Sequence, residues 1–153
     1  MFEPDDIDLH IMRVLQEEGR IANQELADRV GLSPSPCLRR VRRLEEAGLI
    51  DRYVALLDPD RVRRGLDVFV RVRLERQTVD AVERFESEIV VLPEVQACYR
   101  MVGEVDFLIH LVLEDLTGWD EFYMEHLGGL EGVAGITSMI AMRRVKYTTA
   151  LPL

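Results

Sequence analysis

Four arginines stand within five positions of one short segment, RRVRR, at residues 39–43. It lies inside the stretch GLSPSPCLRRVRRLEEAGLI, residues 31–50, in which two serines and two prolines precede the arginines. Arginine binds phosphate and can donate two hydrogen bonds to guanine, so arginines gathered on one helix face indicate DNA binding. The whole chain has a formal net charge of -9, so this positive surface must be local.

The residues around the arginines predict a helix over residues 33–47. A serine can cap its start, prolines fit its first turn, and a glycine follows its end. Its apolar face is expected to consist of Leu38, Val41 and Leu44. The opposite face then carries an exposed stripe at helical spacing, with Arg42 at its edge. The residues expected to contact DNA are Ser33, Ser35, Pro36, Arg39, Arg40, Arg42 and Arg43.

Two further helices are predicted before this one, in DDIDLHIMRVLQEEG and NQELADRVG. The first is expected to be capped by Asp5 or Asp6 and the second by Asn23. The second helix, the turn at residues 31–33 and the arginine helix together form a helix-turn-helix candidate. A charge run alone is usually a solvated surface, and here it could be satisfied by pairs such as Arg42–Glu46. The combination with this supersecondary unit favours DNA contact.

The remainder of the chain alternates strand and helix patterns. LIDRYVALLD, residues 49–58, has the composition of a strand, and a polar linker follows it. From residue 67 onward the predicted order is β-α-β-β-α-β, which is the ferredoxin-like arrangement. VDFLIHLVL is apolar on both faces, although this arrangement covers only one face with helices. A second subunit is therefore expected to cover the other face. The fold class is α+β.

The rest of the sequence excludes several classes of protein. Cys37 and Cys98 are far apart, which argues against a disulfide framework and suits a reducing cytoplasm. The three histidines, His10, His110 and His126, have no metal-ligand spacing, and His110 is interpreted as structural. No nucleophile or nucleotide-binding motif occurs, so we expect neither an enzyme nor a cofactor. No apolar run is long enough to span a membrane, and the expected location is the cytoplasm, at the nucleoid.

Taken together, the stretch from DDIDLHIMRVLQEEG to DRYVALLDP and the later segment VGEVDFLIHLVL resemble the Lrp/AsnC family of transcriptional regulators. The resemblance covers nearly the whole chain. It implies a winged helix-turn-helix domain over residues 1–50, a linker strand or hinge over residues 51–65, and a ferredoxin-like domain over residues 66–153. The second domain would form dimers, which often assemble further into tetramers or octamers, and would bind an amino acid or similar effector between subunits. The segment around residues 53–57 would pair with its copy in the partner subunit.

The resemblance also marks an effector loop in RMVGEVDF, between two predicted strands. Gly103 frees the turn, so that backbone N–H groups can bind a carboxylate, and Asp106 can hold an ammonium group. Without the resemblance, a simple tight hairpin explains the same residues. The chain departs from many family members at Val105, where they carry an aromatic residue, so the ligand is not specified. The expected effector residues are Met101, Val102, Gly103, Glu104, Val105, Asp106, Thr137 and Ser138.

These observations predict a sequence-specific DNA-binding regulator that responds to an amino-acid-like molecule. Two alternatives remain open from the sequence. One is an architectural protein that binds double-stranded DNA with little sequence preference. The other is a small-molecule-binding or catalytic ferredoxin-like protein whose helical domain serves only protein contacts. Residues 1–60 hold eight arginines against thirteen carboxylates, a net charge of -5, so non-specific DNA binding is expected to be weak and steeply salt-dependent.

Overall fold

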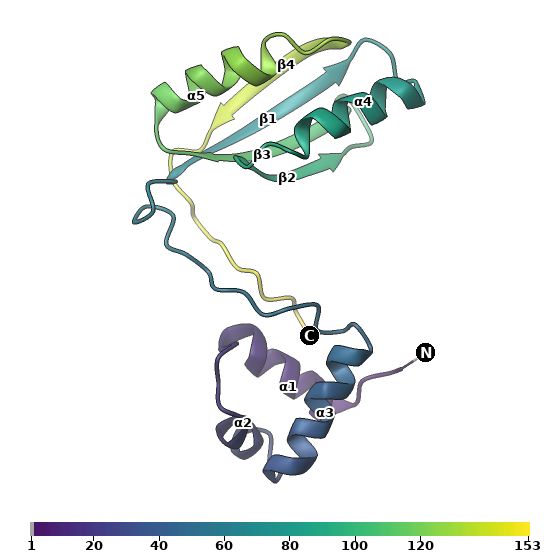
Figure 1. Cartoon of the computed structure of the whole chain (residues 1–153), viewed down its shortest axis with the longest axis vertical. Coiled ribbons are helices and arrows are strands. Elements are labelled where there is room, and N and C mark those ends of the chain that lie inside the picture. Colours follow the sequence, from purple (N-terminus) through teal and green to yellow (C-terminus); the bar gives the residue numbers. More distant parts are fainter. Residues whose placement is uncertain (1) are drawn as a thin grey trace. The chain divides into compact units, whose positions relative to one another are not determined.

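The computed structural model of the chain describes residues 2–153 (Figure 1). Its contacts divide the chain into two compact units. The first unit consists of the residues up to Leu56 together with Lys146–Leu153, and the second consists of Leu57–Val145. The helix-turn-helix candidate lies in the first unit and the effector loop in the second.

The last eight residues lie in the first unit, whereas the family resemblance assigns residues 66–153 to the second domain. Hydrogen bonds to the first helix explain this position. The side-chain amide of Gln16 accepts from the N–H of Leu151 at 2.5 Å and donates to its carbonyl at 3.2 Å. Arg13 Nε donates to the carbonyl of Leu153 at 2.8 Å. The backbone of this C-terminal tail is thus hydrogen-bonded to side chains of the first helix and not to a neighbouring strand.

Three helices make up the first unit: α1 (Asp6–Glu17), α2 (Asn23–Arg29) and α3 (Pro34–Glu46). Asp5 caps α1 as predicted, and it forms a reciprocal capping box with Asp8. The prediction that Asn23 caps α2 is wrong, because Ala22 holds that position. Asn23 instead donates from Nδ2 to the carbonyl of Pro34 at 2.9 Å, which joins α2 to the start of α3.

The strand predicted over residues 49–58 does not form in the single chain, where residues 51–58 have no regular secondary structure. An isolated strand has no neighbour for its N–H and C=O groups. The segment is attached at its start by Tyr53, whose hydroxyl donates to Glu45 Oε1 at 3.0 Å. Burial and this hydrogen bond raise the pKa of Tyr53 to about 12.

The second unit has the predicted ferredoxin-like order. Its four strands form one antiparallel sheet in the order β2-β3-β1-β4, with β1 and β3 at its centre (Figure 1). The two chain segments that connect β1 with β2 and β3 with β4 carry the helices. The elements are β1 (Leu66–Leu74), α4 (Val79–Ile89), β2 (Val95–Arg100), β3 (Phe107–Leu113), α5 (Leu116–Phe122) and β4 (Val133–Ile140).

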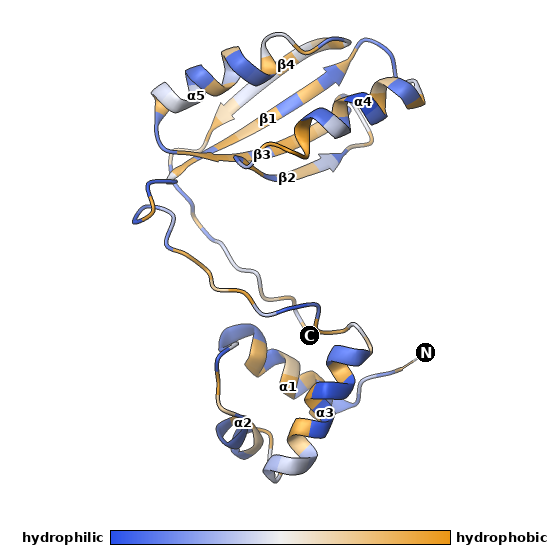
Figure 2. Cartoon of the chain, in the orientation of Figure 1, coloured by the Kyte–Doolittle hydropathy of each residue, from blue (hydrophilic) through white to orange (hydrophobic). Residues whose placement is uncertain are grey.

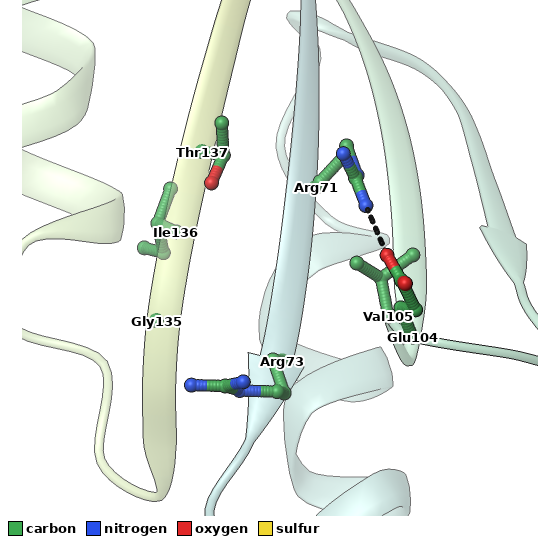
Figure 3. Close-up of a pocket in the computed structure, with 7 residues that line it drawn as sticks. All are labelled: Arg71, Arg73, Glu104, Val105, Gly135, Ile136 and Thr137. Atoms are coloured by element: carbon green, nitrogen blue, oxygen red, sulfur yellow. Dashed lines mark ion pairs between the residues drawn. The ribbon is translucent and has the colours of Figure 1, made fainter.

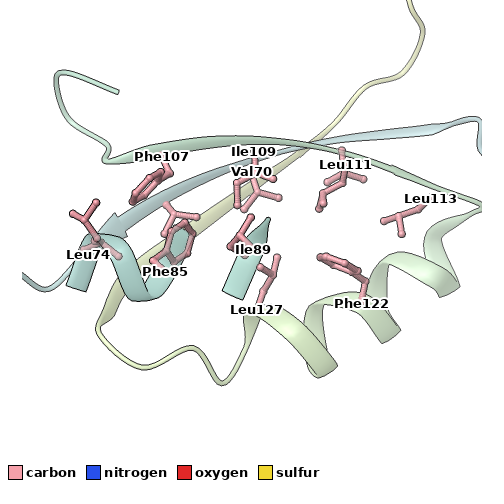
Figure 4. Close-up of a cluster of buried hydrophobic side chains, with 13 residues drawn as sticks. Val70, Leu74, Phe85, Ile89, Phe107, Ile109, Leu111, Leu113, Phe122 and Leu127 are labelled. Atoms are coloured by element: carbon pink, nitrogen blue, oxygen red, sulfur yellow. The ribbon is translucent and has the colours of Figure 1, made fainter. Parts of the chain in front are cut away.

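One face of this sheet is covered by both helices and holds the core of the unit (Figure 4). Alternate residues of β1 and β3 are buried on this face, as the period of two predicts. From α4, Phe85 and Ile89 point toward the sheet, and the Phe85 ring lies 4.5 Å from the ring of Phe107. Phe122 and Leu127 fill the same layer from the second helical segment.

Two elements of the second unit end earlier than the sequence pattern suggests. The sequence VAGITSMIAMRRVKY predicts a final strand over residues 133–147, but β4 stops at Ile140, after which the N–H of Ala141 makes a last backbone hydrogen bond to the carbonyl of Asp67. The sequence DLTGWDEFYMEHLGGL predicts one helix over residues 115–130, but this segment is divided. It is α-helical to Phe122 and continues as the π-helical turn η1 (Tyr123–Leu127).

Among the described residues of the second unit, no helix covers the opposite face of the sheet. Figure 2 shows β3 as mostly hydrophobic, whereas hydrophilic and hydrophobic residues alternate along β1. On this open face, Phe69 of β1 lies opposite His110 of β3 and Met139 of β4, and Leu108 and Val112 of β3 are only half-buried. None of the helices between residues 2 and 153 has the length and hydrophobicity that a membrane-spanning helix requires.

Candidate DNA-binding face and effector hollow

The turn between α2 and α3 has the geometry of a helix-turn-helix. Gly31 has a φ of +71°, a conformation that L side chains rarely adopt, and it ends α2. The next N–H, that of Leu32, donates back to the carbonyl of Ala27 at 2.9 Å. Pro34 and Pro36 occupy the first turn of α3 without N–H groups, and Cys37 donates to the Ser33 carbonyl. The N–H of Ser35 is therefore the backbone donor that the first turn of α3 leaves available to a ligand.

The faces of α3 differ from the prediction by one position. Val41 and Leu44 are buried as predicted, but the third buried residue is Cys37, which is 0% exposed. The prediction that Leu38 faces the core is wrong, since its exposed fraction is 39%. Positions 37, 41 and 44 follow the helical repeat as well as 38, 41 and 44 do. Burial raises the pKa of the Cys37 thiol, which disfavours its reactive thiolate form.

Two of the four arginines that were predicted to contact DNA form ion pairs with carboxylates at the start of α1. Arg40 Nη1 lies 2.8 Å from Asp5 Oδ2 and 2.8 Å from Asp8 Oδ1, and Arg43 Nη2 lies 2.8 Å from Asp8 Oδ2. The side chain of Asp8 is 0% exposed. Hydrogen bonds to Asp5 and then Asp8 raise the pKa of Arg40, so its charge is fixed. The predicted exposed stripe is wrong at Arg40, whose side chain is 25% exposed.

The exposed face of α3 therefore consists of residues three and four positions apart, beginning at Ser35. Arg39 and Arg42 are exposed on it, and neither forms an ion pair with the residues that the structure describes. Leu38 adds an apolar contact between them that the sequence analysis missed. Of the seven predicted DNA-contacting residues, Ser33 and Ser35 are exposed at the helix start, and Pro36 is half-buried.

The loop before β3 is held closed by its own backbone. Met101 N–H donates to the carbonyl of Asp106 at 2.8 Å, and Gly103, with a φ of +135°, allows the turn. The carboxylate of Asp106 accepts from the N–H of Leu74 and from Gln77 Nε2, each at 2.7 Å. The carboxylate of Asp106 thus attaches the loop to the end of β1.

The predicted effector residues line two hollows instead of one. Thr137 lies opposite Arg71 and Ser138 opposite the buried Val70, so the two side chains belong to opposite faces of the sheet. The first hollow, on the open face, contains Glu104, Val105 and Thr137. The second, of about 480 Å³, contains Met101, Val102, Gly103 and Asp106. Ser138 lines neither.

The open-face hollow has a volume of about 540 Å³ and carries both signs of charge (Figure 3). Arg71 Nη2 lies 3.6 Å from Glu104 Oε2, and the side chain of Arg73 extends toward β4 near Gly135. A Cβ atom added at Gly135 would meet no atom within 4 Å, so this side of β4 is open. The sequence analysis missed Arg71, Arg73, Gly135 and Ile136, although the alternation in DVFVRVRLE places both arginines on one face.

The other end of the open face carries a separate polar cluster around Asp67. His110 Nε2 lies 2.7 Å from Asp67 Oδ1, and Arg144 Nη2 lies 2.9 Å from both carboxylate oxygens. The His110 ring stacks on Phe69 at 4.7 Å. Burial opposes ionisation of Asp67, but hydrogen bonds from His110 and Arg144 prevail and lower its pKa. His110 is thus half-buried and bound to Asp67, which is consistent with a structural role.

Comparisons with known proteins agree with both units. A family model described as the Lrp/AsnC ligand binding domain matches residues 67–151, and a winged helix-turn-helix DNA-binding model matches residues 4–51. The Bkd operon transcriptional regulator of Pseudomonas aeruginosa is 45% identical over 100% of both chains. The leucine-responsive regulatory protein of Escherichia coli is 41% identical over 96% of this chain and 90% of that protein.

Two solved structures have the same fold along nearly the whole chain. An AsnC family transcriptional regulator from Agrobacterium tumefaciens has a TM-score of 0.93 and 41% identity, and covers 97% of each chain. A transcriptional regulator from Neisseria meningitidis, solved as a complex with L-Met, also has a TM-score of 0.93 and 41% identity. This second comparison covers 98% of the chain described here and 97% of the other.

Proposed function

Because this chain belongs to the Lrp/AsnC family of transcriptional regulators, we propose that it reads specific double-stranded DNA through α3 and that an amino acid bound to its second unit alters this binding. The observation that carries the proposal is the exposed face of α3. It presents two unpaired cations and a backbone donor on a helix that a helix-turn-helix turn places at the surface.

Each group on this face has a matching group on DNA. Arg39 and Arg42 can donate hydrogen bonds to guanine or bind the anionic phosphates, and Leu38 offers an apolar contact for a thymine methyl group. The N–H of Ser35 points from the helix start, where the helix dipole favours phosphate. Of the seven contacts expected from the sequence, Arg40 carries less weight in this proposal, because carboxylates at the start of α1 already bind it.

A second copy of the chain is proposed to cover the open face of the sheet. Phe69, Leu108, Val112 and Met139 support this, since together they present apolar surface that no helix covers. A dimer would carry two α3 helices, whose half-sites on DNA would lie about one turn apart, roughly 34–36 Å, or a multiple of that. Further assembly to tetramers or octamers is part of the same proposal.

The open-face hollow is proposed to bind the effector. An amino acid carries a carboxylate and an ammonium group, and the hollow offers Arg73 for the first and Glu104 for the second. The hydroxyl of Thr137 can donate to the same carboxylate. L-Met, the ligand of the Neisseria meningitidis relative, is the first molecule to test. The proposal keeps the other predicted effector residues as the loop and strand around the hollow: Met101, Val102, Gly103, Val105, Asp106 and Ser138.

The ligand can regulate only by binding one assembly better than another. If the sheets of two copies meet over the open face, a ligand in this hollow lies at their boundary. It then changes how the copies are arranged, and so which pairs of half-sites can be bound together. Binding and regulation require no catalysis, and we assign the chain no catalytic role, no metal and no cofactor.

The proposal is tested by fluorescence anisotropy with operator DNA and with random DNA of the same length. Arg39→Ala and Arg42→Ala should each weaken operator binding by about 1–3 kcal/mol while the oligomeric mass stays unchanged. Arg84→Ala, on α4 of the second unit, removes the same charge far along the chain and should leave the affinity unchanged. Unaltered binding by both α3 variants would show that this face does not contact DNA. Equal affinity for operator and random DNA would favour the architectural alternative.

A further inference from the structure

The buried carboxylate of Asp8 in α1 holds two arginines of the DNA-facing helix. Arg40 donates to Oδ1 and Arg43 to Oδ2, each at 2.8 Å, and the N–H of Asp5 donates to Oδ2 at 3.2 Å. A carboxylate that is fully removed from solvent needs such partners, because an unpaired buried charge is strongly unfavourable. Both arginines are therefore engaged before DNA arrives.

The four arginines of α3 form two pairs with the same spacing. Arg40 and Arg43 are three positions apart and share one side of the helix. Arg39 and Arg42 are also three positions apart, and each precedes a clamped arginine by one residue, which is a rotation of about 100° around the helix axis. Holding one pair at two points along the helix therefore fixes the direction in which the other pair points.

We propose that Asp8 is a positioning residue that divides the arginines of α3, keeping Arg40 and Arg43 as structural cations and leaving Arg39 and Arg42 to contact DNA. Asp5 supports the division through its own contact with Arg40 at 2.8 Å. The ring of Phe2 supports it too, because the Arg43 guanidinium carbon lies 4.5 Å from the ring centroid. The two clamped charges are also neutralised, which limits attraction to DNA of any sequence.

This inference rests on the proposed function of α3, and adjacent substitutions separate the two. Arg42→Gln and Arg43→Gln remove the same charge from neighbouring positions, and a glutamine at 43 can still donate to Asp8. Arg42→Gln should weaken operator binding about tenfold or more and reduce the log–log salt slope by about 1.8 per dimer, from two lost phosphate contacts. Arg43→Gln should change the affinity less than about threefold and leave the slope unchanged, as for a partly exposed ion pair.

A second variant tests the role of Asp8 itself. In Asp8→Asn the two arginines are released, so binding to random DNA should strengthen severalfold and the salt slope should steepen, while operator binding weakens about tenfold. A purely structural role would weaken operator and random DNA together. Asp6→Asn is the matched control, since it removes an exposed carboxylate from the same helix and should preserve the ratio of the two affinities.

The outcomes are distinct. A loss with Arg43→Gln as large as with Arg42→Gln, with the same fall in slope, would overturn the division of the arginines and leave the DNA-binding function standing. A parallel loss of operator and random binding in Asp8→Asn would overturn the positioning role. If circular dichroism shows that Asp8→Asn is unfolded, the comparison of Arg42→Gln with Arg43→Gln still tests the division of the arginines. No effect from Arg42→Gln and Arg39→Ala would overturn both the inference and the proposed function.

Discussion

Replacement of Arg73 by glutamine should weaken effector binding more than any other single charge removal in the open-face hollow. Arg73 is exposed and forms no ion pair with residues 2–153, so its charge is available to a ligand carboxylate. Arg71, two residues earlier, already faces Glu104 at 3.6 Å. Arg73→Gln keeps a side chain of similar length, which can fill the space without the charge.

The magnitude follows from the exposure of the hollow. A hydrogen bond to a charged group contributes about 1.5–3 kcal/mol in protein interiors, and an open site lies at the low end of this range. A loss of about 1.4 kcal/mol raises the Kd about tenfold. At a ligand concentration one hundred times the wild-type Kd, the ligand stabilises the folded protein by about 2.7 kcal/mol. For the variant, the same concentration gives about 1.4 kcal/mol, so the thermal shift should be halved.

The assay is a thermal-shift titration with each of the twenty amino acids, beginning with L-methionine, followed by light scattering for any that shifts the melting temperature. Arg76→Gln is the matched control, because this exposed arginine follows the same strand outside the hollow. It should retain the full shift. A full shift in Arg73→Gln as well would refute the reasoning that Arg73 faces the ligand.

Two further predictions concern stability. Leu44→Ala should lower the free energy of unfolding by about 2–5 kcal/mol, measured by urea denaturation, because this fully buried side chain joins α3 to α1 and α2. Asp67→Asn should flatten the acid side of the melting-temperature profile. The pKa of Asp67 in the folded chain lies below its ordinary 3.8, so its stabilisation is complete above that pH and is lost as the pH falls through the lower value. An unchanged acid profile would show that Asp67 does not carry this dependence.

Apart from the strand expected over residues 49–58, the order of the elements could be predicted from the sequence, because each observed element has a clear apolar period. The side of α3 that faces the core could not be fixed, because Cys37 and Leu38 are adjacent and both complete the same spacing with Val41. Packing against α1 and α2 decides between them, and cysteine is the smaller of the two. This one-position difference is also why the predicted DNA face is shifted.

Contacts between residues far apart in the sequence could not be predicted either. Nothing local to α3 indicates that Asp8, more than thirty residues earlier, accepts from Arg40 and Arg43. The sequence predicted Asp5 or Asp6 as the cap of α1, and the capping box of Asp5 with Asp8 explains the start of that helix without any arginine. In the second unit, strand alternation already implied that adjacent residues 137 and 138 face opposite sides, and only the strand register shows which side holds the open hollow.

The central claim is that the exposed face of α3 reads DNA sequence, and selection from a random DNA library tests it most directly. Wild-type protein should enrich a two-fold symmetric motif whose halves lie about one helical turn apart. The Arg39→Ala/Arg42→Ala double variant, confirmed as folded and of unchanged oligomeric mass, should enrich no such motif. Enrichment of the same motif by the double variant would contradict the account.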